Sequence, residues 1–169
     1  MTAVNKMILN IKGSNKNYRK LIESAAYYHA EKLVGKRLLK TIKININLRR
    51  GMLKKDDVEG TCIWDDWEDL RKTPRDFTIE LDSGVNIRNI LINLAHEMVH
   101  IKQWAKNEMY EYMNTVDLVR FKGEKIHLKE IEYWDYPWEI EAYGKQLGLF
   151  VRFCEHMGFE KDDNMKEEA

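Results

Sequence analysis

The chain has 169 residues, 44% hydrophobic and 33% charged, and its 28 basic and 28 acidic residues leave no net charge at pH 7. This length predicts a single domain over residues 1–169, and no apolar run is long enough to span a bilayer, so we expect no membrane partner. The two cysteines, Cys62 and Cys154, are too few for a disulfide framework and form no CxxC metal pair, so we expect reduced thiols. Residues 1–6 lack the apolar stretch of a secretory signal, which predicts a cytoplasmic protein.

Segments with strand and helix periodicity follow one another along the chain, which predicts an α+β fold. Residues 15–39 carry apolar side chains at three- and four-residue steps, and residues 41–48 alternate strictly between polar and apolar. His29 and His156 have apolar neighbours in the first and last expected helices, and we interpret both as structural. The full expected order is a strand at 7–11, a helix at 15–39, strands at 41–48, Gly60–Trp64 and 77–81, a helix at 86–106, a hairpin at 119–127 turning at Lys122-Gly123, a helix from Pro137, and a frayed tail at 160–169.

Charge is unevenly distributed between the two parts of the chain. Residues 1–60 hold 14 lysines and arginines against five acidic residues. Such a surplus could contact nucleic acid, but no nucleic-acid-binding motif accompanies it, so we interpret it as an ordinary solvated surface. A separate acidic group lacks the spacing of an EF-hand and is interpreted as a turn. The cations include Lys32, Lys36, Arg37, Lys40, Lys43, Arg49, Arg50, Lys54 and Lys55, and the acidic group is Asp65, Asp66, Glu68 and Asp69.

Residues 96–100 read His-Glu-Met-Val-His, an HExxH pattern inside the helix expected at 86–106. Two histidines four residues apart lie one turn apart on the same helix face, so both imidazoles can reach one metal ion. Glu97 lies beside them, where it can take a proton from water activated by that metal. The histidines belong to a polar stripe that is separate from the buried apolar stripe of the helix, which predicts that this face lines a cleft. The stripe comprises Asn89, Asn93, His96, His100 and Gln103.

A hydrolytic zinc site needs a third protein ligand and one open position for water. The histidine candidates after the HExxH pattern are His127 and His156, and several carboxylates also follow it. Pro137 favours the start of a helix, because the first turn does not use its missing N–H group. This helix carries Glu139 and Glu141 in its first turns. We therefore expect one of these two glutamates to complete the site.

The HExxH pattern followed by Glu-Ile-Glu-Ala at residues 139–142 resembles the gluzincin zinc peptidases, in which a glutamate from a later helix joins the two histidines. The resemblance implies that the third ligand is Glu139, the glutamate of an ExxA pattern. Glu141 is the alternative, if Glu141 and the alanine after it correspond to the Glu-Ala pair of thermolysin-type enzymes. The related ExxxD pattern would end at Tyr143, so its aspartate is missing from this chain.

The small size and the aromatic run that leads into residues 139–142 also resemble SprT-like metallopeptidases, many of which are encoded by bacteriophages, which would place the protein in a host cytoplasm. SprT-type sites use a third histidine in a His-Gly context, and this chain has no such pair. The resemblance implies a minimal zincin-like fold, with a small mixed sheet packed against a long N-terminal helix, the HExxH helix and a C-terminal Glu-bearing helix. In such folds the last strand before the active helix is an edge strand that pairs with substrate, here Thr78, Ile79 and Glu80.

The implied function is a zinc-dependent peptidase that acts on a protein or peptide. One Zn²⁺ per chain, held by His96, His100 and Glu139, would lower the pKa of water towards about 7. Glu97 would then accept the proton and pass it to the leaving amine. The alternative is a catalytically weak zincin-like binding module that acts on a protein or nucleic-acid partner, although such a module has no chemical need of Glu97. Candidate donors for the oxyanion are Tyr133, Tyr136, Tyr143 and His127.

Overall fold

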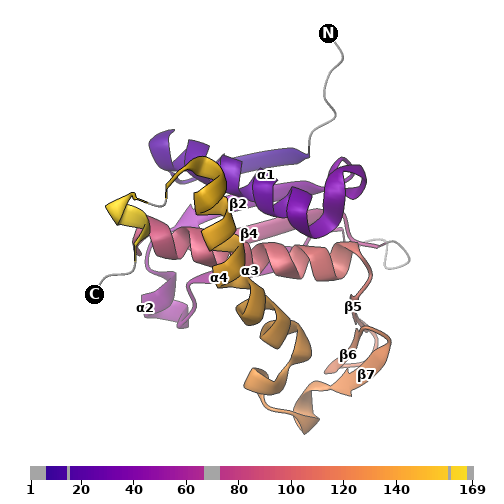
Figure 1. Cartoon of the computed structure of the whole chain (residues 1–169). Coiled ribbons are helices and arrows are strands. Elements are labelled where there is room, and N and C mark those ends of the chain that lie inside the picture. The colour runs from indigo at the N-terminus through magenta and orange to yellow at the C-terminus, as the bar shows by residue number, and fades with distance from the viewer. Residues whose placement is uncertain (1–6, 15, 67–72, 160, 167–169) are drawn as a thin grey trace.

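A four-stranded sheet in the order β1-β2-β4-β3 forms the centre of the computed structural model, which describes residues 7–14, 16–66, 73–159 and 161–166 (Figure 1). β1 (Ile8–Lys12), β2 (Lys43–Arg49) and β4 (Asp76–Asp82) run parallel, and β3 (Gly60–Trp64) pairs antiparallel with β4. Alternate residues of β2 and β4 are buried, as the alternation in the sequence predicts, so one face of the sheet carries the core. The paired core residues are Ile44 with Phe77, Ile46 with Ile79, and Leu48 with Leu81.

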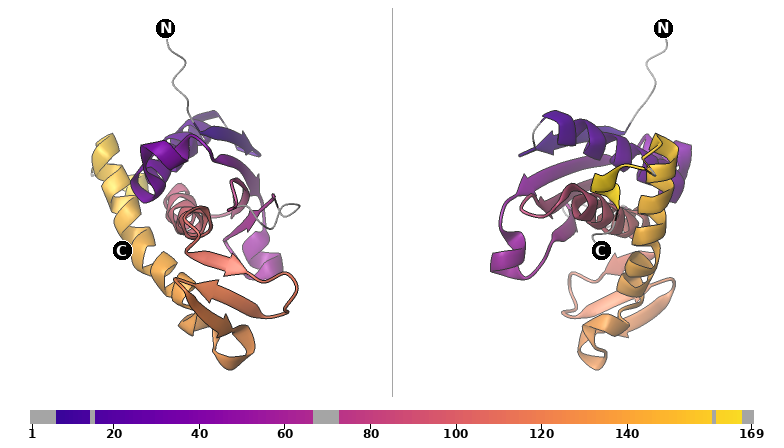
Figure 2. Two further views of the ribbon diagram at one scale, coloured as in Figure 1. Left: turned by 90° about the vertical axis from the view of Figure 1, so that its right-hand side faces the viewer. Right: turned by 60° about the vertical axis from the view of Figure 1, so that its left-hand side comes forward.

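Helices α1 (Lys16–Leu39) and α3 (Ile87–Ala105) pack against each other and against the sheet, and α4 (Pro137–Met157) crosses α3 on its other side. Figure 2 shows α3 nearly end-on, enclosed by α1, α4 and the sheet. Every residue from 94 to 105 in α3 is consequently buried, including both HExxH histidines. Polar groups on this stretch of helix need partners inside the protein, since leaving them unpaired would be costly. No helix in the described part of the chain is both long and apolar enough to cross a membrane.

A second, smaller sheet packs at the end of α3 and leads into α4 (Figure 1). Its strands β5 (Met109–Glu111), β6 (Leu118–Phe121) and β7 (Glu124–His127) are antiparallel, and the expected hairpin between β6 and β7 is confirmed. Its turn residues Lys122 and Gly123 have φ values of 48° and 95°. The other short elements are α2 (Met52–Asp56) and the 3₁₀ turns η1 (Leu128–Glu130), η2 (Tyr133–Asp135) and η3 (Asp163–Met165).

The expectation that Thr78, Ile79 and Glu80 form an edge strand is wrong. These residues belong to β4, which is paired with β2 on one side and with β3 on the other. The chain adds β3 outside β4 although β3 comes earlier in the sequence, so β3 forms the edge of the sheet and contacts α3. Strand order depends on this long-range pairing, and the local pattern of hydrophobic residues does not encode it.

The expected frayed tail is also wrong for residues 161–166, while residues 160 and 167–169 lie outside the described part. η3 is closed by the side chain of Asp162, which accepts a hydrogen bond from the backbone N–H of Asn164 at 3.0 Å. Met165 packs against the core, and η3 contacts α3. One apolar side chain and one capping aspartate therefore order a segment that its composition alone predicts to be loose.

Several cations of the basic N-terminal part pair with carboxylates within the fold. Lys43 pairs with Asp76 at 2.7 Å, and Arg49 pairs with Glu80 at 2.7 Å, both on the polar face of the sheet. The charges of Lys43 and Arg49 are thus balanced within the sheet. In the acidic group, Asp65 accepts a hydrogen bond from Thr78 at 2.6 Å. Glu68 and Asp69 lie outside the described residues.

Candidate metal centre

Three side chains from two helices converge at the centre of α3. His96 Nε2 and His100 Nε2 lie 3.1 Å apart, one turn from each other as the HExxH spacing predicts. Glu139, in the first turn of α4, places Oε2 3.3 Å from His96 Nε2 and Oε1 3.5 Å from His100 Nε2. One ligand atom from each of the three residues lies within 4.8 Å of the others, an arrangement that can hold a metal ion. Of the two candidate glutamates, the fold brings Glu139 to the histidines.

Two glutamines bind the far nitrogens of the imidazole rings. His96 Nδ1 lies 2.8 Å from Gln146 Oε1, and His100 Nδ1 lies 2.9 Å from Gln103 Oε1. An amide oxygen can only accept, so each Nδ1 carries the hydrogen and each Nε2 is turned towards Glu139. Partners of this kind set the tautomer and the ring orientation of histidines that bind metals.

The charges at this site are strongly coupled. Burial alone would raise the pKa of the Glu139 carboxyl, but hydrogen bonding to His100 and His96 and their positive charge outweigh it and lower the pKa to about 2. Burial lowers the pKa of His100, but its hydrogen bond to the Glu139 carboxylate and the negative charge of Glu97 raise it overall. In the metal-free protein the buried carboxylate of Glu139 thus favours the protonated form of His100.

The donor set fits a zinc ion. Two imidazole nitrogens and one carboxylate are ligands that Zn²⁺ uses in hydrolytic enzymes. Glu139 Oε2 is fully buried, and its contact with His96 Nε2, at 3.3 Å, falls short of good hydrogen-bond geometry. A cation between this oxygen and the two nitrogens would satisfy it better than this contact does.

Glu97 faces the same site from the α3 residue between the two histidines. Its side chain is only 5% exposed, and burial raises the pKa of its carboxyl to about 7, although the charges of His100 and His96 oppose this rise. Gly60 of β3 leaves the room that this carboxylate occupies. A Cβ added at Gly60 would lie 2.8 Å from Glu97 Oε1 and 3.3 Å from a methyl group of Leu81. A side chain at residue 60 would therefore displace Glu97.

A cleft of about 800 Å³ opens on the site. The edge strand β3 contributes Gly60, Thr61 and Cys62 to its lining. Aromatic side chains from η2 and α4 line another part, among them Trp134, which is 70% exposed. The three ligand candidates and Glu97 also line this cleft, so a molecule in it can reach the reactive groups. The prediction that the histidine face lines a cleft is confirmed for Asn93, His96 and His100, whereas Asn89 and the buried Gln103 do not line it.

Tyr133 and Tyr143 are the two candidate oxyanion donors that line the cleft. The ring of Tyr143 contacts His96 edge-on, with centroids 4.6 Å apart. Burial, the negative charge of Glu139 and a hydrogen bond to Tyr143 together raise the pKa of the Tyr133 hydroxyl, which therefore stays protonated and able to donate. The other two candidates lie elsewhere: the Tyr136 hydroxyl donates to the Leu128 carbonyl oxygen at 3.5 Å, and His127 is exposed at the end of β7.

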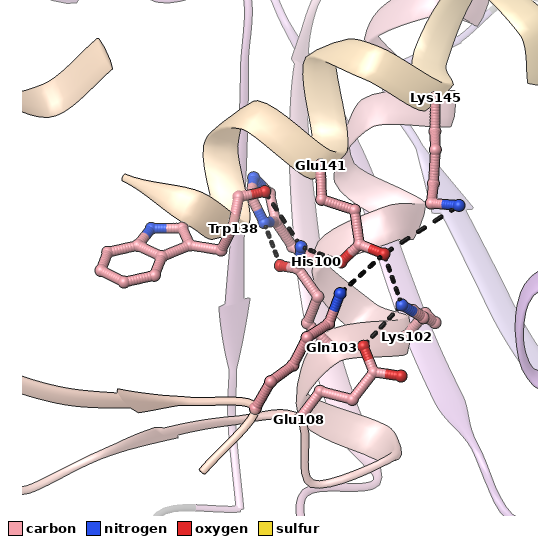
Figure 3. A network of polar contacts seen from close by, with 8 residues as sticks. His100, Lys102, Gln103, Glu108, Trp138, Glu141 and Lys145 are labelled. Carbon is pink, nitrogen blue, oxygen red and sulfur yellow. Dashed lines mark hydrogen bonds and ion pairs between the residues drawn. The ribbon is translucent and has the colours of Figure 1, made fainter. Parts of the chain in front are cut away.

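Glu141 points away from the histidines and into a buried network of polar side chains (Figure 3). Its carboxylate lies 2.8 Å from Lys102 Nζ and 3.0 Å from Gln103 Nε2. Lys102 also pairs with Glu108 at 2.5 Å. Burial opposes a low pKa for Glu141, but its bonds to Lys102 and Gln103 lower the pKa overall, so its charge is neutralised without a metal.

Two residues that the sequence gives no clear reason to choose complete the surroundings of the site. Gln146 lies seven residues after Glu139, hence on the same face of α4, a spacing from which it could have been found. Asp82, at the end of β4, accepts backbone N–H bonds from Gly51 at 2.9 Å, Leu53 at 2.8 Å and Gly84 at 2.7 Å. Leu53 lines the cleft, so Asp82 holds one part of its rim in place.

No protein-family model matches this chain, and neither does any curated protein or solved structure. The functional argument therefore depends on the geometry and chemistry of the candidate centre.

Proposed function

We propose that this protein is a zinc-dependent peptidase with a zincin-like fold, in which His96, His100 and Glu139 hold the metal. The observation that carries the proposal is the convergence of these three ligand atoms beside Glu97 at one end of an open cleft. Zinc bound there would act as a Lewis acid that acidifies water and polarises a carbonyl group.

The role proposed for Glu97 is that of general base. Its carboxyl has a pKa near 7 because it is buried, which suits a group that must take up a proton and release it again near neutral pH. It would accept a proton from water and deliver it to the amine that leaves. Tyr133 and Tyr143 would donate hydrogen bonds to the developing oxyanion from the aromatic part of the cleft.

Substrate binding is proposed for β3, the strand that replaces β4 as the edge. β3 pairs with β4 on one side, and its other side has no strand partner within the described residues. An extended peptide could add to this edge through backbone hydrogen bonds, which do not depend on sequence. The position of Gly60 against Glu97 would bring the added peptide close to the general base.

The test compares the wild type with Glu97→Gln, both loaded with zinc, on an unfolded protein substrate. Gln keeps the shape of the side chain but cannot accept a proton, so we expect a loss of about 10²–10⁴-fold in the rate of cleavage. Zinc content should stay the same in both proteins, because Glu97 is not a ligand. Cleavage by Glu97→Gln at the rate of the wild type would contradict the proposed role of Glu97, and an inactive zinc-loaded wild type would contradict the peptidase proposal.

A further inference from the structure

We propose that Gln103 is the positioning residue of this centre: it fixes the ring of His100 and also holds the first turn of α4, which carries Glu139, against α3. The inference rests on the proposed function, since it assumes that the two histidines and Glu139 bind a metal. It assigns a role to a glutamine that binds no metal and touches no substrate.

The orientation of the Gln103 amide follows from its partners. The side chain is 0% exposed, so its polar groups must be satisfied within the protein. Its nitrogen donates to the carbonyl oxygen of Trp138 at 2.9 Å and to Glu141 Oε2 at 3.0 Å. Both partners are acceptors only, so the nitrogen must face them and the oxygen must face His100. His100 Nδ1, 2.9 Å from that oxygen, must then carry the hydrogen, which leaves Nε2 for the metal.

The same amide links α3 to the ligand-bearing turn of α4. Its two acceptors, Trp138 and Glu141, stand on either side of Glu139 in the sequence, at the start of α4. Gln103 therefore connects the position of the Glu139 backbone to the orientation of the His100 ring. A change in this amide should disturb two of the three ligands at once.

The buried Lys102 and two exposed lysines surround the carboxylate of Glu141 at the far end of this chain of contacts (Figure 3). Lys102 Nζ lies 2.8 Å from Glu141 Oε1, and the ammonium groups of Lys122 and Lys145 lie 3.5 Å and 4.0 Å from the same oxygen. They keep Glu141 ionised, so it remains an acceptor and the amide of Gln103 cannot turn over. Lys102 thus holds Glu141, Glu141 holds the amide of Gln103, and that amide orients the ring of His100.

Gln146 provides a matched comparison within the same centre. Its oxygen accepts from His96 Nδ1 at 2.8 Å, but its side chain is only partly buried and lines the open cleft. Water can reach His96 Nδ1 if this glutamine is lost, and a bridging water is nearly as good as a direct hydrogen bond. The equivalent position at His100 is closed to water, since Gln103 is fully buried.

The experiment measures zinc affinity by chelator competition, and the thermal stability of the metal-free protein, for the full chain. Gln103→Met keeps the length of the side chain but removes its hydrogen bonds, and we expect about 10- to 100-fold weaker zinc binding. Gln146→Ala is the comparison: it leaves room for water at His96 Nδ1, so we expect a smaller loss of zinc affinity than in Gln103→Met.

Exchanging the amide of Gln103 with the carboxylate of Glu141 tests whether Gln103 acts through its hydrogen bonds or only through packing. Gln103→Glu alone would place two carboxylates where the amide and the carboxylate now lie 3.0 Å apart, so binding should stay weak. Gln103→Glu combined with Glu141→Gln restores one donor and one acceptor. The carboxylate at residue 103 then accepts from His100 Nδ1, but the Trp138 carbonyl oxygen loses its donor. Zinc affinity should therefore recover in part, to a value between those of Gln103→Glu and the wild type.

Unchanged zinc affinity in Gln103→Met, with or without a lower melting temperature, would overturn the inference, because Gln103 would then serve only in packing. Failure of the double variant to bind zinc better than Gln103→Glu would overturn it as well. In both of these outcomes, a wild type that binds zinc would still support the proposed metal centre. A wild type without zinc would overturn both proposals.

Discussion

Buried histidines lie in two regions of this molecule, and the groups around their ring nitrogens differ. His29 of α1 is 0% exposed, and within the described residues neither of its ring nitrogens has a hydrogen-bond partner. The rings of Tyr28 and Phe153 lie 5.6 Å and 5.7 Å from it. His96 and His100 are nearly as buried, but each has an amide oxygen at Nδ1 and Glu139 near Nε2. The comparison teaches that the partners of a buried histidine, rather than its burial, distinguish a candidate site from a core residue.

The electrostatics of the two regions differ for the same reason. Burial lowers the pKa of His29 to about 4, and no carboxylate counteracts it. For His100 the same effect is outweighed by Glu139 and Glu97, and the pKa is raised. A neutral histidine is thus acceptable in the core, while the site is built to accommodate positive charge.

Exchange of the histidines for leucine should give the largest difference between the two regions. His100→Leu removes one of the three proposed ligands, and we expect the purified protein to bind no zinc. His29→Leu puts an apolar side chain among aromatic neighbours, and we expect it to keep one zinc per chain. Metal analysis after gel filtration measures both. Zinc loss in His29→Leu with the fold intact, or zinc retained in His100→Leu, would break the comparison.

The stability of the metal-free protein should depend on the charge of His29 at acid pH. Its pKa is depressed from 6.5 to about 4, so the unfolded chain binds more protons than the native state between these values. The stabilising contribution is fully present above pH 6.5 and is lost as the pH falls towards 4, about 3 kcal/mol in total. Urea unfolding from pH 7 to pH 4 measures it.

His29→Leu is the control for this pH dependence, since leucine does not titrate. Its free energy of unfolding should fall by about 3 kcal/mol less than that of the wild type over the same range. His100→Leu should keep the loss attributed to His29. If His29→Leu and the wild type lose the same stability, His29 is not the titrating group.

A smaller effect is expected at Gly60, which tests whether the site depends on space as well as on partners. The Cβ of Gly60→Ala would lie 2.8 Å from Glu97 Oε1, so Glu97 must move, and we expect a fall in kcat of up to about 100-fold. Zinc content should not change. Gly148→Ala is the matched control: no atom lies within 4 Å of its added Cβ, and alanine should stabilise α4 by about 0.5–1 kcal/mol without affecting kcat. Full activity in Gly60→Ala would show that Glu97 tolerates the displacement.

Helix α3 and most of the strands could be predicted from the sequence, because their periodicity is local. The HExxH spacing alone places His96 and His100 on one face of α3. The choice between Glu139 and Glu141 could not be made in this way. Residues two positions apart on an α-helix point in directions that differ by about 200°, so only one of the two glutamates can face the histidines. The packing of α4 on α3 decides which one does.

Features that depend on long-range contacts were predicted least well. The edge position of β3 results from its pairing outside β4, whereas the resemblance to zincin-like folds implied that β4 forms the edge. The network of Lys102, Glu108 and Glu141 joins three separate segments, and no spacing in the sequence reveals it. Gln103 was expected on the polar stripe of its helix, but its link to Glu141 follows only from the fold.

The most direct test of the central claim is the zinc content of the purified wild type beside Glu139→Gln and Glu141→Gln. We expect one zinc per chain in the wild type and in Glu141→Gln, since the glutamine at residue 141 still accepts from Gln103. Glu139→Gln should lose the metal. Zinc retained by Glu139→Gln and lost from Glu141→Gln would contradict the assignment of the third ligand. A wild type that does not bind added zinc would contradict the metal centre itself.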